Sequence, residues 1–115
     1  MARGKIYQPE HGHFVYATLN PQAGTEQAGR CPALVVSDTA ANIGTGVAFV
    51  VPITNQVKGG PLEVPVPAGC RITGVALPEH LKSVDWMARN VEFAGEAPAD
   101  FVEDVLAKLA ALLRL

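Results

Sequence analysis

Apolar residues in this chain fall into short runs divided by polar segments that contain glycine and proline, until one long amphipathic pattern begins near the C-terminus. Runs rich in aromatic and β-branched residues predict strands at 14–19, 33–37 and 47–51. The second and third runs are apolar almost without interruption, as in strands that are buried on both faces. We expect Pro52 to end the third strand, and the polar segment 1–11 to be a loose lead-in.

The middle of the chain carries weaker strand patterns. Residues 62–66 alternate apolar and polar positions around an internal proline, which predicts a strand at the edge of a sheet. Residues 73–77 predict another strand, and 78–82 a short helical turn with proline at its first position. Residues 84–93 predict one strand, or two strands around a bend. The connector 38–46 has room for one helical turn.

The C-terminal segment 100–114 predicts an amphipathic helix. Its apolar residues repeat at steps of three and four positions, which is the spacing of one helical face. Asp100 and Glu103 follow Pro98 in a pattern that resembles a capping box at the start of the helix. We expect this helix to pack against its own sheet. Short strands followed by one helix predict a single domain over residues 1–115, mostly β with a terminal helix (α+β), in the form of a small barrel.

Composition and charge add two restrictions. Lys and Arg total 9 against 11 Asp and Glu, so the net charge of −2 predicts no basic surface broad enough to hold nucleic acid by charge alone. Any contact with nucleic acid must use a local patch. The chain is 49% hydrophobic and only 17% charged, which is compatible with a buried oligomer interface and equally with a small, well-packed monomer.

Cysteine and histidine usage restricts the chemistry further. The chain has 2 cysteines, Cys31 and Cys70, whose number and spacing indicate neither a disulfide framework nor a zinc site, so we expect free thiols in a reducing compartment. Neither a signal segment nor a transmembrane run is recognisable, and we expect a cytoplasmic protein without membrane contact. His11 and His13 lack a third ligand, so we expect a solvent-exposed pair and no metal site.

Chemistry is concentrated where two predicted strands begin or end. A polar, glycine-bearing loop, residues 22–30, leads directly towards strand 33–37. Strand 47–51 is followed by Thr54, Asn55 and Gln56, whose side chains can all form hydrogen bonds. Two neighbouring strand ends that present polar groups are a favourable place for a binding or catalytic site.

Four sequence blocks carry a family resemblance: GHFVYATLNP (12–21), EQAGRCPALVVS (26–37), VPITNQ (51–56) and GVALPEHLKSVDWMARNVEF (74–93). In this order, with the C-terminal helix after them, they resemble the MazF/PemK family of toxin endoribonucleases. The resemblance spans nearly the whole chain. It implies an SH3-like barrel of the MazF/PemK/CcdB type and a homodimer.

The resemblance also implies a toxin of a toxin–antitoxin pair that cleaves single-stranded mRNA at specific sequences, without a metal or other cofactor. The ribose 2′-OH attacks the adjacent phosphate, which leaves a cyclic phosphate and a free 5′-OH. The family uses a threonine and an arginine directly before a proline, because an arginine supplies positive charge and two planar donors to phosphate oxygens. The threonine is present as Thr54, but Cys31 occupies the arginine position before Pro32.

Cys31 is the departure that limits the functional prediction. A cysteine cannot hold a positive charge or donate in a bidentate manner. Arg30 is adjacent, but neighbours on an extended strand point to opposite faces, so it would replace the family arginine only if the chain turns there. Three interpretations stay open: a selected or engineered detoxified variant, a natural homologue with weak or lost activity, and a site in which Arg30 has taken over.

Further residues are predicted to contact RNA, each with a structural alternative as a loop, turn or salt-bridge residue. These are Glu26, Gln27, Asn55, Gln56, Lys58, Ser83, Asp85 and Arg89. Trp86 is predicted to be a core residue rather than a platform for a base. The expected partners are single-stranded RNA, a second copy of the chain, and a cognate antitoxin with an acidic, partly disordered C-terminal segment. The alternative function is a non-catalytic binding module on the same barrel, either an antitoxin-binding homologue or a topoisomerase poison like the related CcdB toxins.

Overall fold

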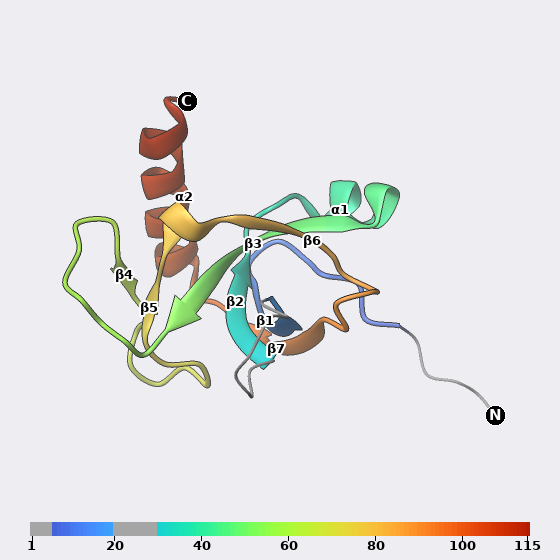
Figure 1. Ribbon diagram of the computed structural model, residues 1–115, viewed down its shortest axis with the longest axis horizontal. Coiled ribbons are helices and arrows are strands. Elements are labelled where there is room, and N and C mark those ends of the chain that lie inside the picture. Colours follow the sequence, from blue (N-terminus) through green and yellow to red (C-terminus); the bar gives the residue numbers. More distant parts are fainter. Residues whose placement is uncertain (1–5, 20–29) are drawn as a thin grey trace.

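The computed structural model describes residues 6–19 and 30–115, which form an antiparallel sheet with one long helix packed on it (Figure 1). The strands are β1 (His13–Thr18), β2 (Arg30–Val35), β3 (Val47–Thr54), β4 (Val64–Pro65), β5 (Val75–Ala76), β6 (Lys82–Asp85) and β7 (Glu92–Glu96). The helices are α1 (Thr39–Thr45), the short 3-10 helix η2 (Pro78–His80) and α2 (Ala99–Leu113). The prediction of a mostly β fold with a terminal helix is confirmed.

The strands follow the order β4-β5-β3-β2-β1-β7, and β6 pairs with β3 outside this path. β3 is central: one of its edges pairs with β2, while the other is shared by β6 along residues 47–50 and by β5 at residues 53–54. The expected small barrel is an open one in the described part of the chain. The sheet curls, but no ladder there joins β7 to β4 or β6 (Figure 1).

The expectation that Pro52 ends its strand is wrong, because β3 continues through it to Thr54. The N–H and C=O of a strand residue point to the same edge. The Pro52 carbonyl accepts the N–H of Leu77 at 2.9 Å, so the missing N–H lies on the outer edge, between the segments that pair with β6 and with β5. A proline removes no ladder hydrogen bond at such a position. β3 can therefore carry Thr54 to the end of the sheet.

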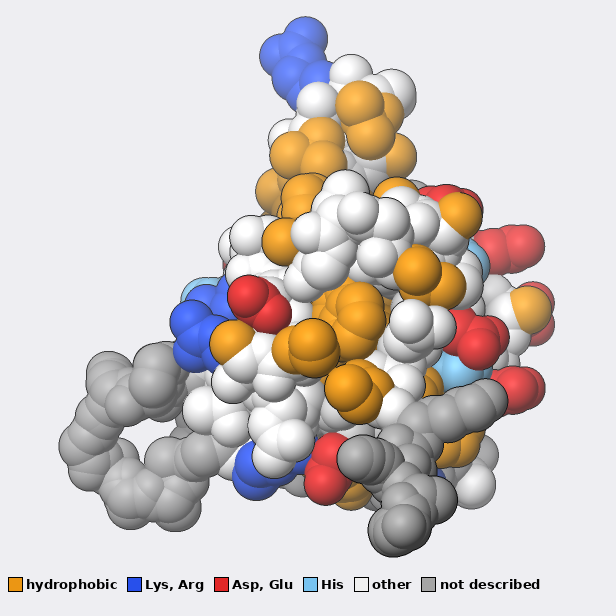
Figure 2. Space-filling model, turned by 90° about the vertical axis from the view of Figure 1, so that its right-hand side faces the viewer, with side chains coloured by type: hydrophobic (Ala, Val, Ile, Leu, Met, Phe, Trp, Pro, Cys, Tyr) orange, Lys and Arg blue, Asp and Glu red, His pale blue; other side chains and the backbone are white. Residues whose placement is uncertain are grey.

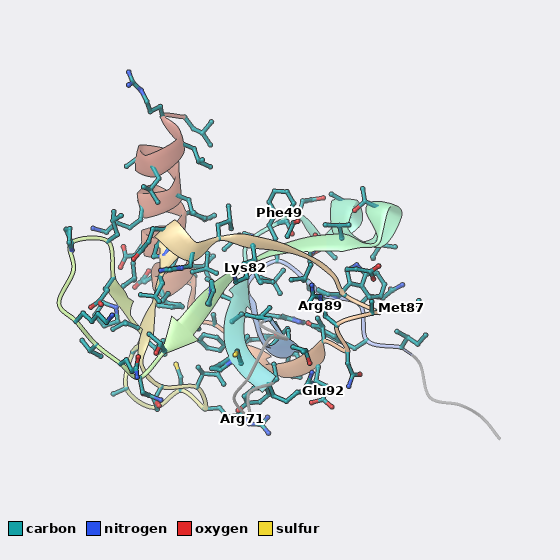
Figure 3. All side chains as sticks on the ribbon, viewed as in Figure 1. Phe49, Arg71, Lys82, Met87, Arg89 and Glu92 are labelled. Carbon is teal, nitrogen blue, oxygen red and sulfur yellow. The ribbon has the colours of Figure 1, made fainter. Side chains whose placement is uncertain are left out.

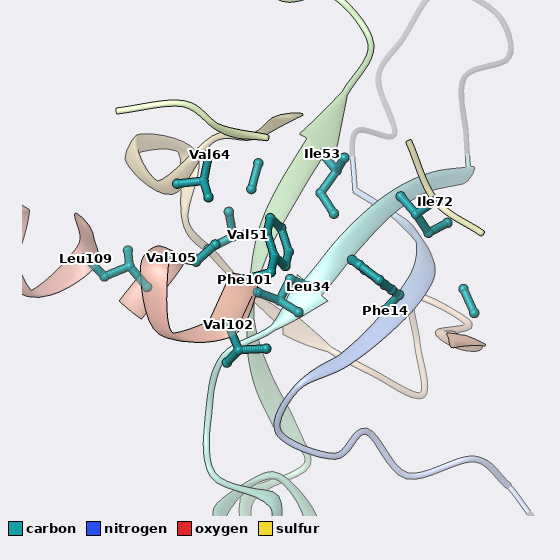
Figure 4. Close-up of a cluster of buried hydrophobic side chains, with 12 residues drawn as sticks. Phe14, Leu34, Val51, Ile53, Val64, Ile72, Phe101, Val102, Val105 and Leu109 are labelled. Carbon is teal, nitrogen blue, oxygen red and sulfur yellow. The ribbon is translucent and has the colours of Figure 1, made fainter. Parts of the chain in front are cut away.

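Two separate clusters of apolar side chains bury the two faces of the sheet. Neighbours on one strand belong to different clusters: Phe14 and Val51 lie on the α2 side, whereas Val15 and Val50 lie on the opposite side. Figure 4 shows the cluster on the α2 side, where buried residues of the helix meet those of β1, β2 and β3. Burial on both faces explains why β2 and β3 consist of nearly continuous apolar runs.

Helix α2 confirms the amphipathic prediction to within one residue at each end. The capping-box prediction is wrong, because the N-cap is Pro98, which makes no side-chain capping bond. Asp100 lies in the first turn instead, where its charge is favourable to the helix dipole. The helix is buried as far as Leu109, and its end extends beyond the sheet, with Leu112 and Leu113 40% and 56% exposed (Figure 1).

Several boundaries differ from the sequence prediction. β2 begins earlier than expected, at Arg30, because it pairs with β1 as far as Thr18. β4 and β5 are only 2 residues long each, in a region interrupted by glycine and proline. Of the two options for 84–93, two strands are correct. A turn divides them, in which the N–H of Arg89 donates to the Asp85 carbonyl and Asn90 has a φ of 54°.

The lead-in, described from residue 6 onward, is mostly exposed but is anchored to the fold at Pro9. Pro9 is buried, and its carbonyl accepts a hydrogen bond from the Asn42 side chain at 3.0 Å. Asn42 belongs to α1, whose first turn is capped by Asp38 through the N–H of Ala41. α1 has 7 residues and so exceeds the single turn expected. Within the described residues, no helix is long and apolar enough to cross a membrane.

Candidate functional site

Thr54 is the last residue of β3, and its half-buried side chain stands at the end of the sheet. Its Oγ1 accepts the N–H of Gln56 at 3.0 Å. A hydroxyl that accepts in this way keeps its own proton available to donate. The turn therefore orients the Thr54 hydroxyl and leaves it a donor for an oxygen such as one of a phosphate.

A second backbone segment holds Thr54 in place by close approach. Gly74, just before β5, has a φ of 117°, and a Cβ added to it would lie 2.3 Å from the Thr54 carbonyl oxygen. Only glycine fits both this contact and this φ. Beside it, Thr73 donates from Oγ1 to Asn55 Oδ1 at 3.1 Å. These two residues therefore fix the end of β3 and the beginning of the loop that follows.

Cys31 lies in β2, and its partly buried side chain packs against the core cluster that also contains Ala33 and Val35. The register of β2 and β3 pairs Ala33 with Pro52. The pairing ends there; if the same register is extrapolated by two residues along both strands, Cys31 falls opposite Thr54. The position that carries an arginine in the resembled family thus faces the Thr54 end of the sheet.

Arg30 extends across β1 and away from β3. Its Nη2 is 2.8 Å from Glu92 Oε1, and its Nη1 donates to a backbone carbonyl of the β6–β7 turn at 2.7 Å. Arg89 donates from Nη1 to the Thr18 carbonyl at 3.2 Å. Figure 3 shows Arg89 and Glu92 on the β7 side of the molecule. Two arginines thus gather at the outer end of β1, on the opposite side of β2 from Thr54.

A cleft of about 300 Å³ opens beside Thr54. The loop after β3 and the η2 region line it together: Thr54, Gln56, Lys58, Gly60, Glu63, Leu77, Glu79 and His80. The sequence prediction included Thr54, Gln56 and Lys58 but missed Glu79 and His80. Pro78 was recognisable as the start of a turn, but the sequence does not show that this turn lies against the loop. The cleft offers donors and acceptors for a polar ligand and one lysine for a negative charge.

Other predicted contacts lie away from this cleft. Ser83 and Asp85 are exposed on β6, which pairs with the first half of β3. Asp85 also accepts a backbone N–H of the following turn at 3.1 Å, the turn role that was its structural alternative. Glu26 and Gln27 lie outside the described residues. The predicted site residues that the structure describes are therefore divided between the Thr54 cleft, the outer end of β1 and β6.

Trp86 is a core residue, as predicted: it is buried, and its Nε1 donates to the Asn42 carbonyl at 2.9 Å. The expectation of a solvent-exposed histidine pair is wrong. His13 is mostly buried, and its Nδ1 shares a hydrogen bond of 2.6 Å with the Tyr7 hydroxyl, while burial raises the pKa of Tyr7 to about 12. His11 is exposed in the turn before β1. Among the described residues, no group of 3 or more His, Cys, Asp or Glu side chains could hold a metal ion.

Comparison with known proteins identifies the family. A family model described as "PemK-like, MazF-like toxin of type II toxin-antitoxin system" matches residues 10–113. The endoribonuclease toxin MazF of Escherichia coli (strain K12) is 37% identical over 107 residues, which cover 93% of this chain and 96% of that protein. The endoribonuclease PemK of Escherichia coli is 32% identical over 108 residues, which cover 90% and 81%. This chain therefore belongs to the PemK-like, MazF-like family of toxins.

Solved structures agree with this assignment. The crystal structure of MazF from Deinococcus radiodurans matches with a TM-score of 0.86 at 46% identity, covering 95% of this chain and 99% of that one. A MazE–MazF crystal structure from the same organism gives a TM-score of 0.86 at 44% identity, with the same coverage of 95% and 99%. The fold that the resemblance implied, that of the MazF/PemK toxins, is confirmed.

Proposed function

We propose that this chain is the toxin of a toxin–antitoxin pair and that its site is built for metal-independent, sequence-specific cleavage of single-stranded mRNA. One observation carries the proposal: in a member of this toxin family, β3 ends on an oriented threonine hydroxyl beside a polar cleft. The MazF and PemK relatives are named as endoribonucleases, which supports the same reaction here. The mRNA that such an enzyme cuts is in the cytoplasm, the compartment that the sequence predicts.

The proposed reaction balances with RNA and protein alone. The 2′ oxygen of one ribose attacks the neighbouring phosphorus, and the bond from that phosphorus to the 5′ oxygen of the next nucleotide breaks. The 2′ proton passes to a base and a proton is returned to the 5′ oxygen, so the products are a 2′,3′-cyclic phosphate and a 5′-OH. Negative charge grows on the phosphate oxygens in the transition state, where the Thr54 hydroxyl would donate a hydrogen bond.

We infer that Cys31 makes this chain a slow or inactive enzyme. The register of β2 and β3, extrapolated by two residues beyond Ala33 and Pro52, puts Cys31 opposite Thr54, and a thiol supplies neither a positive charge nor paired donors. Loss of one transition-state donor typically costs about 10²–10³-fold in rate. Arg30 is a poor substitute, because its ion pair with Glu92 lies on the other side of β2. This arrangement favours weak or lost activity, natural or selected, over a site in which Arg30 has taken over.

We propose that RNA binds along the loop after β3. Asn55, Gln56 and Lys58 are exposed there, and the last two line the cleft. Lys58 offers a positive charge to a phosphate, while His80 on the η2 side offers hydrogen-bonding groups to a base edge. Three other predicted RNA contacts, Ser83, Asp85 and Arg89, do not line the cleft, and Glu26 and Gln27 are outside the described residues; all five stay predictions.

A cognate antitoxin is the first proposed protein partner. The solved MazE–MazF complex of a relative supports it. The acidic, partly disordered C-terminal segment of the antitoxin would fold as it binds and would compete with RNA for the positive charge of Lys58.

A second copy of the chain is the other proposed partner. Apolar side chains that are at least 40% exposed on the described helices and strands support a homodimer: Ile43, Phe49, Phe93, Leu112 and Leu113. Figure 2 shows apolar side chains gathered over the middle of one face and along the end of α2 above it. Light scattering at micromolar protein concentration tests the dimer, and the mass of a single chain would contradict it.

A non-catalytic binding module on the same fold is the second candidate function. Cys31 favours it, because a homologue that has lost the catalytic arginine can still bind an antitoxin. The exposed end of α2 is compatible with a topoisomerase poison. The sequence predicted that this helix packs on its own sheet, but Leu112 and Leu113 at its end are exposed. The family match is to PemK-like and MazF-like toxins, however, which favours the nuclease.

The test is cleavage of a pool of single-stranded RNA, with EDTA present, by the purified chain and by a Cys31→Arg variant. If only the variant cleaves, and leaves 5′-OH ends, the chain is a weakened toxin and Cys31 is the cause. If both cleave at comparable rates, another residue contacts the phosphate and the site assignment is wrong. If neither cleaves, the binding module replaces the nuclease as the proposed function.

A further inference from the structure

Glu63 closes the loop that follows β3. Its Oε2 accepts the N–H of Lys58 at 3.0 Å, and its Oε1 accepts the N–H of Gly59 at 2.9 Å. Consecutive backbone groups thus use both oxygens of one carboxylate, in an arrangement that the φ of 78° at Gly59 permits. Hydrogen bonds to an ionised acceptor are stronger than those to a neutral one. The carboxylate is therefore an effective brace for this loop.

Other hydrogen bonds hold the two ends of the same loop. At the β3 end, Thr73 donates to Asn55 Oδ1. At the far end, Lys108 of α2 donates from Nζ to the Pro61 carbonyl at 3.1 Å. Glu63 acts between these anchors, on the backbone N–H groups of residues 58–59 in the exposed loop. The position of the middle of the loop thus depends on Glu63.

The same carboxylate lines the cleft beside Thr54, together with Gln56 and Lys58 of the loop that it closes. A carboxylate next to a phosphate site is unfavourable by charge, since like charges repel. Both oxygens of Glu63 accept backbone N–H groups, which offset part of its charge. Its contribution to the cleft is thus to fix where the loop side chains stand relative to Thr54.

We propose that Glu63 is a positioning residue that holds Gln56 and Lys58 at the cleft, so that single-stranded RNA binds with its phosphate beside Thr54. This inference rests on the proposed function. It predicts that removal of the Glu63 carboxylate weakens RNA binding, the opposite of what the loss of a negative charge alone would do. Removing a negative charge from an RNA site strengthens binding through electrostatics, whereas release of the loop weakens it.

The test compares the wild type with Glu63→Gln, Glu63→Ala and a control, Glu103→Gln, which removes an exposed carboxylate of α2. Fluorescence anisotropy in EDTA measures binding of a labelled pool of short single-stranded RNA. Amide hydrogen exchange at Lys58 and Gly59 measures release of the loop, and circular dichroism confirms that each variant folds. If Glu63→Ala does not fold, Glu63→Gln still decides the question, because it keeps only one acceptor oxygen.

We expect Glu63→Ala to bind RNA about tenfold more weakly, because a disordered loop must be ordered again on binding. Glu63→Gln should lose less, and both variants should exchange faster at the two amides. The Glu103→Gln control should match the wild type in affinity and in exchange.

Two results would overturn the inference alone: RNA binding that is unchanged or tighter in both Glu63 variants, or exchange at Lys58 and Gly59 that does not change. In either case the wild type still binds RNA, so the proposed function stands. If neither the wild type nor Cys31→Arg binds RNA, the proposed function fails, and the inference fails with it.

Discussion

The Thr54 cleft and the outer end of β1 differ in the groups they offer: the first holds a hydroxyl and the second positive charge, and the proposed RNA cleavage needs both. At the cleft, an oriented hydroxyl stands at the end of β3, and the register of β2 and β3, extrapolated beyond Ala33 and Pro52, leads to Cys31 on the neighbouring strand. At the end of β1, Arg30 and Arg89 supply positive charge but are bonded to Glu92 and to backbone carbonyls. Arg30 and Cys31 are sequence neighbours, yet strand alternation directs them to opposite faces. In a site built on a sheet, the parity of a position matters as much as the residue type.

Restoring charge to the Thr54 side should have the largest effect. We expect Cys31→Arg to raise the single-turnover rate of RNA cleavage by about 10²–10³-fold, the usual value of one transition-state donor. Rapid-quench assays measure this rate. Cys31→Lys is the matched control, because it supplies charge without a planar pair of donors and should recover only part of the rate. No gain with either variant would show that the missing arginine does not limit the chain.

Removing the hydroxyl from the same region should rank second. In the Cys31→Arg background, we expect Thr54→Val to lower the cleavage rate by about 10- to 100-fold, because the growing charge on the phosphate loses a donor. Thr54→Ser, which keeps the hydroxyl, should stay within a few-fold of its parent. Equal losses in the two variants would mean that the methyl group of Thr54 matters more than its hydroxyl.

A substitution at Gly74 tests how much the close approach of its backbone to Thr54 contributes to stability. We expect Gly74→Ala to cost about 2–3 kcal/mol of unfolding free energy, because its Cβ would meet the Thr54 carbonyl and its φ is unfavourable for alanine. Urea denaturation measures the change. Gly44→Ala in α1 is the control: its Cβ meets nothing within 4 Å, so it should be neutral or stabilising. Similar costs at both glycines would refute the close contact.

Substitutions at the outer end of β1 should have the smallest effect on cleavage and stability. Because the Arg30–Glu92 pair is solvent-exposed, we expect Arg30→Ala to cost less than about 1 kcal/mol of unfolding free energy. Cleavage by the Cys31→Arg background should change little. A large loss of cleavage with intact stability would instead place Arg30 at the phosphate and remove the distinction between the two regions.

The parts of the fold that the sequence predicted are those whose patterns follow from burial. β1, β2 and β3 are short runs rich in apolar residues, α2 repeats apolar residues at the spacing of one helical face, and the structure contains all four elements. The predictions failed where a partner distant in sequence decides. Pro52 stays inside β3 because of where β6 and β5 pair, and His13 is buried because Tyr7 covers it. β4, at the edge of the sheet, and β5 beside it are short because glycine and proline interrupt this region.

The candidate site shows the same division. Gln56 and Lys58 line the cleft with Thr54 because Thr54 ends β3 and the other two follow it directly in the chain, which the sequence shows. Glu79 and His80 were missed, because they reach the cleft only through the packing of η2 against the end of β3. Glu63 was missed for a related reason, since its place in an edge-strand pattern does not reveal that its carboxylate turns back onto the loop.

By itself, the sequence determined the strands and helix, the family, the presence of Thr54 and the cysteine in place of an arginine. Those features depend on local periodicity and residue identity. Only the tertiary structure decided on which side of β2 Arg30 finds its partners, where the cleft opens and what holds the loop beside Thr54. These outcomes depend on hydrogen bonds and packing between distant segments, such as Arg30 with Glu92 and Gly74 with Thr54, which no local pattern in the chain encodes.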